Sequence, residues 1–472
     1  MKPSVGIVGG GILGMTAAYR LAQAGVAVSL YERAPDLGGL VGSFDFDGTA
    51  ADRFYHVVLP SDDRVLGLAD ELGVGDKWRF QPTRVGFYGD GRLFSMTSPK
   101  EFLTFPLLRP HERVRLALFV ARCQLTSGHA ALDDEPLDEW LRRLCGRGVV
   151  EKLWKPLLDS KFDGKLEDLP ATYIWARTRR MGSTRDKSGR EVMGWLDGGY
   201  QTIIDALEKK IVALGGVVNA GATVEQIGAE GGRAVGVVVD GRLQRFDHVL
   251  CTLAPPMARR VLAPELIEQA PADHCRYLGV ICLLLRVNRS VSPYYHLNIT
   301  DRRVPLTTVV ETTHVVDPER VGGHLLYVSK YVDPGHPDHE ASPEELERKY
   351  LAYARTIFPD LRDDEIISSV VQRARVTEPV HLVGGAKRLP EMFSVPGLSL
   401  ASTAHVYPEI VSGQAVIGVT NQVVPGILER LPSRRPCGSR SRSAGSPWRH
   451  RARDESLPEG GASSPPRTTP GW

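Results

Sequence analysis

The first structural unit of the sequence is Val5-Gly6-Ile7-Val8-Gly9-Gly10-Gly11-Ile12-Leu13-Gly14. An apolar strand pattern leads into three spaced glycines, and a helical pattern follows. Gly9 permits a tight turn, Gly11 lets the backbone approach a diphosphate, and Gly14 lets the helix pack closely on the strand. The backbone amides at the start of the helix, at Ile12 and Leu13, then face the diphosphate.

An acidic residue completes this pattern. The second strand, predicted at residues 27–31, ends at Glu32 and is followed by Arg33. A carboxylate at this place accepts hydrogen bonds from the hydroxyls of an adenosine ribose and repels a 2′-phosphate. Strand, turn, helix, second strand and acid together predict a dinucleotide site of the Rossmann type, with Arg33 as a further contact.

A second glycine pair, Gly38 and Gly39, lies shortly after the acid and is followed by Leu40. NAD binding does not need such a pair. The pair lets another loop pass close over the diphosphate and the ribityl chain of a flavin, so the sequence predicts FAD, bound in part by the backbone at Gly38, Gly39 and Leu40.

From these residues the sequence resembles the FAD-dependent amine oxidase-like superfamily, and its protoporphyrinogen oxidase-like branch most closely, over residues 4–431. Segments 52–56, 195–200, 222–227 and 404–409 carry the resemblance further. It implies a non-covalent FAD with His56 beside the flavin, Val224 at the adenine, and Thr403 and Val411 near the last flavin turn. Two positions depart from the family: Leu40 replaces an arginine, and Ala401-Ser402-Thr403 replaces an acidic strand end.

Three side chains are candidates for the catalytic site. His56 is placed to tune the flavin or move a proton near neutral pH, and the alternative is a structural histidine. Lys161 is a candidate cavity cation for an anionic substrate. Tyr407 is expected near the face of the flavin ring. Further candidates for lining the cavity, each more often a core or surface residue, are Arg84, Tyr88, Trp154, Trp195 and Glu311.

The order of predicted elements indicates an α/β protein with a discontinuous FAD-binding domain and an inserted α+β substrate domain. We assign residues 1–95, 195–265 and 385–431 to the FAD-binding domain and 96–194 and 266–384 to the substrate domain. Residues 432–472 hold eight Arg against three acids and almost no aliphatic residues. This composition predicts a disordered tail.

Composition excludes several classes of protein. The 472 residues have a formal net charge of +2, unlike a polycation built for nucleic acid. The six cysteines form no CxxC pair, and no metal site is expected. Neither a leader peptide nor a long apolar run is visible, which favours a cytoplasmic protein. The mixed apolar and basic segment 102–125 is most simply an amphipathic helix, and peripheral membrane contact is its alternative.

The sequence therefore predicts an FAD-dependent oxidase, dehydrogenase or desaturase that takes a hydride from a C–N or C–C bond of a small molecule. No GxSxG, HExxH or Walker motif points to another chemistry. Two alternatives stay open. One is a redox-neutral, flavin-dependent sugar-nucleotide mutase, and the other is a flavin-binding protein without activity.

Overall fold

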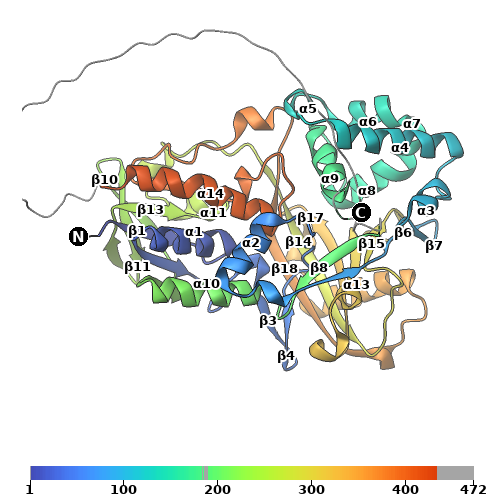
Figure 1. Cartoon of the computed structure of the whole chain (residues 1–472), viewed down its shortest axis with the longest axis horizontal. Helices are drawn as coiled ribbons and strands as arrows, with labels where there is room; N and C mark the ends of the chain where they lie inside the picture. Colours follow the sequence, from blue (N-terminus) through green and yellow to red (C-terminus); the bar gives the residue numbers. More distant parts are fainter. Residues whose placement is uncertain (1, 183, 185–189, 433–472) are drawn as a thin grey trace, which may run out of the picture. The chain divides into compact units, whose positions relative to one another are not determined.

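The glycine-rich turn lies in a five-stranded parallel sheet with the order β19-β13-β1-β2-β9 (Figure 1). The computed structural model describes residues 2–182, 184 and 190–432. Of the predicted disordered tail, residues 433–472 therefore lie outside the described residues. The five strands are β1 (Ser4–Val8), β2 (Ala27–Glu32), β9 (Val217–Ala220), β13 (His248–Cys251) and β19 (Leu398–Leu400), and every neighbouring pair is parallel.

Helices cover one face of this sheet. The side chains of each strand alternate between the core under these helices and a second core on the opposite face. Val5 and Ile7 point into a core shared with the helices, whereas Val8 points into the core on the opposite face. The helices are α1 (Ile12–Gln23), α2 (Asp63–Leu72), α10 (Gln201–Ala213) and α14 (Gly413–Arg430). In Figure 1, α10 and α14 flank α1 over the parallel sheet.

The opposite face carries a small antiparallel sheet and two short helices. The sheet has the order β10-β11-β12 and is formed by β10 (Gln226–Glu230), β11 (Arg233–Val239) and β12 (Arg242–Arg245). The helices are α11 (Pro255–Val261) and α12 (Pro264–Ile267). Ile227, Val237 and Leu266 are buried together with Val8 and Val249, so the parallel sheet is closed on both faces, as is typical of parallel sheets.

A seven-stranded sheet, β18-β14-β17-β16-β15-β6-β7, forms the second large element. Its strands are β6 (Val85–Gly89), β7 (Arg92–Ser95), β14 (Arg276–Val287), β15 (His296–Ile299), β16 (Thr308–Glu311), β17 (His324–Val332) and β18 (Ile366–Val380). One face packs on α13 (Pro343–Ile357). Cys282, Leu284 and Tyr327 lie in a different buried cluster, together with residues of the segment that precedes α2.

A helical bundle follows the strand β7. Its helices are α3 (Pro99–Leu103), α4 (Pro110–Leu125), α5 (Ala130–Asp133), α6 (Leu137–Cys145), α7 (Arg147–Val149), the π-helical turn η3 (Val150–Trp154), α8 (Lys155–Phe162) and α9 (Thr172–Gly182). Two antiparallel strand pairs complete the fold: β3 (Ser43–Phe46) with β4 (Thr49–Asp52), which form a hairpin, and β5 (Trp78–Pro82) with β8 (Val192–Leu196), which lie far apart in sequence.

The structure confirms the predicted α/β class, with local corrections. Apolar residues at three- and four-residue spacing predict a helix over residues 102–108, but α3 ends at Leu103, and Pro106 and Pro110 follow. Proline lacks the amide that would continue the helix. The long strand β18 was not predicted, because its many polar residues hide any alternation.

Residues Met1–Pro432 form one compact unit by their contacts. Strands β6 and β7 belong to the cofactor domain in the predicted division. In the structure β6 pairs with β15 of the predicted substrate domain, and β7 extends the same sheet by pairing with β6. Within the described ranges, no helix has the length and apolar character needed to cross a bilayer.

Candidate functional site

The turn between β1 and α1 has the geometry of a diphosphate cradle. Gly9 adopts a positive φ of 108°, and its amide donates to the carbonyl oxygen of Tyr31 on β2 at 2.9 Å. A Cβ on Gly14 would lie 2.0 Å from the carbonyl oxygen of Gly9. Gly9 and Gly14 are therefore required by the turn itself, whatever it binds.

Gly11 differs from Gly9 and Gly14 because nothing in the described chain fills the space beside it. A Cβ there would find only the carbonyl oxygen of Gly38, at 4.0 Å, and its φ of −71° suits any residue. No side chain caps the amide end of α1 at this residue, although the first amides of a helix have no partner within the helix. An open space bounded by free amides fits a diphosphate.

The loop that carries Gly38 and Gly39 lies directly on the turn between β1 and α1. The amide of Gly38 donates to the carbonyl oxygen of Gly10 at 2.9 Å, and Gly11 and Gly38 form a parallel bridge. A Cβ on Gly39 would lie 3.4 Å from the Cα of Gly11. Leu40 follows at the surface, 37% exposed. Gly38 and Gly39 both have a positive φ, 106° and 60°, and this conformation is what favours glycine in the loop.

Glu32 closes the other side of the turn. Its carboxylate accepts hydrogen bonds from the amides of Gly10, at 2.7 Å, and Ala34, at 2.8 Å. These two bonds orient the side chain, and each carboxylate oxygen keeps a second acceptor position for a ribose hydroxyl. The neighbouring Arg33 is exposed at the same strand end. The residues present therefore fit the adenosine diphosphate part of FAD.

Three separate segments meet where the flavin end is expected. The rings of His56 and Tyr200 lie edge to face, with centroids 5.3 Å apart. A Cβ on Gly413, at the start of α14, would lie 2.6 Å from the hydroxyl of Tyr200, and one on Gly199 would lie 2.3 Å from a carboxylate oxygen of Asp52. Neither Asp52 nor Tyr200 is singled out by the sequence, and only the fold brings Tyr200 beside His56.

Burial sets the protonation of this group. It lowers the pKa of His56 to about 4 and raises the pKa of Asp52 to about 7. Nδ1 of His56 is buried and has no hydrogen-bond partner among the described residues. The lowered pKa makes the imidazole neutral near pH 7. A buried polar atom without a partner is uncommon in a folded protein, so this nitrogen is available for a bound group.

The remaining predicted cofactor contacts are spread around the sheet. Val224 is buried in the same cluster as Val8, at the end of β1. Thr403 begins the 3-10 turn η9 (Thr403–His405) directly after β19, and Val411 precedes α14 and packs on the core that holds α1. Their positions agree with a cofactor lying along the carboxyl edge of the parallel sheet, and the individual contacts stay predictions.

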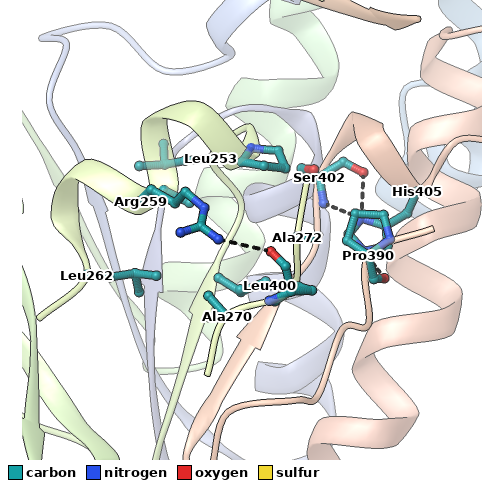
Figure 2. A pocket seen from close by; sticks show the side chains of 12 residues that line it. Leu253, Arg259, Leu262, Ala270, Ala272, Pro390, Leu400, Ser402 and His405 are labelled. Atoms are coloured by element: carbon teal, nitrogen blue, oxygen red, sulfur yellow. Dashed lines mark hydrogen bonds between the residues drawn. The ribbon is translucent and has the colours of Figure 1, made fainter. Parts of the chain in front are cut away.

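Figure 2 shows a small, mainly apolar cavity between the ends of β13 and β19. His405 lies at its edge. Its Nδ1 accepts the amide proton of Ser402 at 3.1 Å, which leaves Nε2 to donate to the carbonyl oxygen of Pro390 at 3.0 Å. Both ring nitrogens are thus used within the protein, and His405 anchors the turn after β19.

Lys161 is not the free cation that the sequence suggested. Its Nζ lies 2.5 Å from Oε2 of Glu378 on β18, and 3.1 Å from the centre of the Tyr331 ring. Both charged side chains are close to fully buried, with 10% and 13% of their area exposed. This correction could not come from the sequence, since Glu378 lies on the strand that was missed.

Arg177 supplies the free positive charge instead. Its Nη1 donates to the hydroxyl of Tyr173 at 2.9 Å, and among the described residues no carboxylate lies within ion-pair distance of it. Burial, and next the charge of Arg177, lower the pKa of His296 to about 4. Lys161, Arg177 and Glu378 therefore form a buried cluster with a net charge of +1.

This charged cluster is connected to the flavin end through the residue next to His56. The Tyr55 ring lies 6.3 Å from that of His296 and 6.4 Å from that of Tyr327, both on the seven-stranded sheet. Burial, opposed by the nearby Arg177, raises the pKa of Tyr55 to about 12. The segment that carries Tyr55 and His56 therefore lies between the parallel sheet and the charged cluster.

Tyr407 contacts the helical bundle. Its hydroxyl bonds to Asp133 at the end of α5 and lies 2.7 Å from the hydroxyl of Thr172, and its ring centroid is 4.7 Å from that of His381. A place for Tyr407 at the face of the flavin ring stays a prediction.

The other candidates for the cavity have structural surroundings. Tyr88 packs on the α13 side of the sheet and donates to the carbonyl oxygen of Thr356 at 3.1 Å. Glu311 is buried and accepts two backbone amides, from Val291 and Ser292. Arg84 lies over the ring of Tyr294. Trp154 and Trp195 pack against buried apolar clusters.

Acid is expected to destabilise the fold, beginning below about pH 6.5. Burial lowers the pKa to about 4 for His56, His248, His296 and His381. Between pH 6.5 and 4 the unfolded chain therefore binds protons that the folded chain does not, and each histidine removes up to about 1.4 kcal/mol of stability per pH unit of decrease. Asp52 acts in the opposite sense, because its raised pKa makes the folded chain bind a proton there.

Urea unfolding at pH 7.5, 6.5, 5.5 and 4.5 measures this loss. His248→Asn is the matched variant, since His248 pairs with Ser399 away from the candidate site, and it should reduce the slope by about one proton. A free energy of unfolding that does not change between pH 7.5 and 4.5 would contradict the assignment of neutral, buried histidines.

Comparison with known proteins identifies similar chains. The model of the flavin-containing amine oxidoreductase family matches residues 14–414. Coproporphyrinogen III oxidase of Mycobacterium bovis is 27% identical over 283 residues, which are 55% of this chain and 61% of that protein. Zeta-carotene desaturase of Synechocystis is 28% identical over 176 residues, 32% of this chain and 36% of that protein.

A solved structure agrees over nearly the whole described fold. The putative protoporphyrinogen oxidase of an Exiguobacterium species superposes with a TM-score of 0.68 at 22% identity, covering 91% of this chain and 99% of that one. This likeness concerns the fold. The curated relatives are matched over only 31% to 63% of their own length.

Proposed function

Because this chain belongs to the flavin-containing amine oxidoreductase family, we propose that it is an FAD-dependent oxidoreductase that takes a hydride from a C–N or C–C bond of a small molecule. The observation that carries the proposal is the open space beside Gly11, covered by the Gly38–Gly39 loop and closed by Glu32. No side chain of the described chain uses this space, and its shape and donors suit a flavin dinucleotide.

The family match confirms the predicted resemblance and the predicted flavin cofactor. It also favours the oxidoreductase over the sugar-nucleotide mutase, because the matched curated relatives include oxidases and a desaturase. The alternative of a flavin-binding protein without activity is distinguished by experiment below.

The chain's own residues divide the work of holding the cofactor. Amides at Gly11, Ile12 and Leu13 would bind the diphosphate, Glu32 the adenosine ribose, and Val224 the adenine through its backbone. When bound, FAD supplies the acceptor for a hydride. Nδ1 of the neutral His56 would accept or donate one hydrogen bond at the flavin end, and Tyr200 would hold the imidazole ring in place.

The charge of the buried cluster favours a substrate with an anionic group over an amine. Lys161 and Arg177 together exceed Glu378 by one positive charge, and a cationic substrate would add repulsion in a medium of low dielectric constant. Arg177 is the group that would pair with the substrate, because Lys161 already has a partner. A carboxylate is the simplest anion that a guanidinium binds in two places.

Anaerobic mixing tests the activity and the substrate class together. Purified protein with bound FAD is mixed with amines, with porphyrinogens and with carboxylated polyenes, and loss of flavin absorbance reports hydride transfer. We expect a carboxylate-bearing substrate to reduce the flavin. In Arg177→Met the Kd of this substrate should rise about tenfold or more, whereas the Kd of its methyl ester should change little.

Arg142→Met is the control, because Arg142 is an exposed arginine on α6 with surface ion pairs. Reduction by amines and not by carboxylates would contradict the substrate class. A flavin that no substrate of the three classes reduces would favour a protein without activity.

Two further predictions accompany this function. The division into a cofactor domain and a substrate domain, with the boundaries given from the sequence, stays a proposal, as does a cytoplasmic location. The small-molecule substrate would bind where the Tyr55–His56 segment meets the seven-stranded sheet.

A further inference from the structure

Asp52, the last residue of β4, carries a carboxyl group that has no partner in the described part of the chain. No amide or hydroxyl of the described residues donates to it, and none of their cations lies within ion-pair distance. Other acids close by in sequence are engaged. Asp45 on β3 accepts the amide of Gly48 at 2.9 Å, and Asp62 pairs with Arg180 at 2.7 Å. Asp52 is therefore set apart from the carboxylates that hold the fold together.

This carboxyl group lies against the turn that leads into α10. A Cβ on Gly199 would lie 2.3 Å from Oδ1 and 3.3 Å from Oδ2 of Asp52, so the carboxyl group occupies the place where a side chain would be. Gly199 has a positive φ of 68°, which favours glycine. The next residue, Tyr200, packs its ring against that of His56. Asp52 therefore lies at the same end of the cradle as His56.

Backbone contacts of this segment join the cofactor cradle to the seven-stranded sheet. The amide of Arg53 donates to the carbonyl oxygen of Gly42 at 3.1 Å, at the end of the loop that covers the diphosphate cradle. The Arg53 side chain pairs with Asp36 at 3.2 Å. From the other side, the hydroxyl of Tyr327 on β17 donates to the backbone carbonyl oxygen of Asp52 at 2.9 Å. Asp52 is thus fixed between the cradle and the sheet at which the substrate is proposed to bind.

The groups that face Asp52 are neutral or already paired. Arg320, on the 3-10 turn η5 (Pro318–Val321) that packs on β4, lies 2.6 Å from Asp197. His56 is neutral near pH 7. Burial, and to a smaller extent the charge of Asp52, raise the pKa of three tyrosines: Tyr200, Tyr295 and Tyr327. No group stabilises the ionised carboxylate, and burial raises the pKa of Asp52 from 3.8 to about 7. This carboxyl group can therefore gain or lose a proton near neutral pH.

We infer that Asp52 is the proton acceptor of the dehydrogenation, an inference that rests on the proposed oxidoreductase function. When the substrate gives a hydride from its C–H bond to bound FAD, it loses two electrons, and a proton remains on the neighbouring nitrogen or carbon. A carboxylate oxygen of ionised Asp52 takes this proton while the C=N or C=C double bond forms. The carboxyl group becomes neutral, so charge and electrons balance. His56 is the weaker base, because its pKa is about 4.

Infrared difference spectra of the full chain with FAD, taken without substrate from about pH 5.5 to 8.5, measure the proton on Asp52 without turnover. We expect the C=O stretch of one neutral carboxylic acid to disappear with an apparent pKa of about 7, and this change to be absent in Asp52→Asn. Asp52→Asn should fold, because the unaltered protein already holds a neutral group there below pH 7. Asp45→Asn, exposed on the same hairpin, is the matched control and should keep the signal.

Anaerobic reduction of the flavin measures the proton transfer itself, with whichever of the amines, porphyrinogens and carboxylated polyenes reduces it. The rate constant of reduction should rise with pH and level off above about pH 7, because only the ionised carboxylate accepts a proton. Asp52→Asn should lower this rate constant at least about a hundredfold at about pH 8, and it should lose the pH dependence. The Kd values of FAD and of the substrate should change little, and Asp45→Asn should react like the unaltered chain.

Three results would overturn the inference. The first is an infrared titration near pH 7 that Asp52→Asn leaves unchanged, or no such titration at all. The second is reduction of the flavin by Asp52→Asn at the rate of the unaltered chain. The oxidoreductase function would then stand, and a hundredfold loss in His56→Gln would assign the proton to His56. The third is a flavin that no substrate reduces although Asp52 titrates, since the proposed function would then fail and this inference with it.

Discussion

Gly11→Val is expected to give a folded protein that has lost most of its FAD. The space beside Gly11 holds no protein atom other than the carbonyl oxygen of Gly38, at 4.0 Å, and its φ of −71° is open to any residue. A side chain there would therefore meet the diphosphate and little of the protein. The Kd for FAD should rise at least about tenfold. This change corresponds to a loss of about 1.4 kcal/mol in binding free energy and is readily measured.

Two other glycines make this prediction specific. Gly14→Ala should destabilise the protein with or without FAD, because its Cβ would lie 2.0 Å from a backbone oxygen. Gly67→Ala, an exposed position on α2 with no atom within 4 Å, should leave both FAD content and stability unchanged or slightly improved. Circular dichroism and the flavin-to-protein ratio distinguish the three. Normal FAD content in Gly11→Val would contradict the proposed path of the diphosphate.

Glu378→Gln is expected to lower the free energy of unfolding by about 3 kcal/mol or more. It leaves the buried Lys161 without its carboxylate partner and beside a second cation, Arg177. Lys161→Met should cost less, because the charge of Arg177 still acts on Glu378: the pKa of Arg177 is raised first by Tyr173 and further by Glu378. Lys161→Met/Glu378→Leu should return to within about 1 kcal/mol of the unaltered protein, since an apolar pair of similar size often replaces a buried ion pair without loss.

The pH dependence of these variants follows from the lysine. Burial lowers the pKa of Lys161 to about 8, against 10.5 for an ordinary lysine. Between these values only the unfolded chain keeps the proton, so this group makes stability rise with pH from about 8 to 10.5. Glu378→Gln should extend the rise to lower pH. Equal stability of Glu378→Gln and the unaltered protein at pH 7 would show that the pair is not buried as described.

The sequence predicts those parts of the molecule that are local in the chain. Gly9, Gly11, Gly14 and Glu32 act within one strand–helix–strand unit, so their spacing alone indicates both the turn and the ligand. Apolar periodicity likewise predicts one helix over residues 343–357 and another around residues 412–431, and the structure has α13 at Pro343–Ile357 and α14 at Gly413–Arg430.

Contacts between distant segments were beyond the sequence. Lys161 was singled out, but its partner Glu378 lies 217 residues away on a strand with no clear alternation. The sequence around Arg177 on α9 has the pattern of an ordinary amphipathic helix. Only the fold shows that no carboxylate of the described chain lies within ion-pair distance of the Arg177 guanidinium. Strand β6 joins β15 in parallel across more than two hundred residues, a pairing that strand propensity does not encode.

The measurement that tests the account most directly is the flavin content of the purified full chain. We expect absorption bands near roughly 370 and 450 nm and, after heat release, about one FAD for each chain, with little NAD or FMN. A colourless protein that takes up no FAD or other flavin when these are added would contradict the central claim that the Gly11 cradle, the Gly38–Gly39 loop and Glu32 bind a flavin dinucleotide.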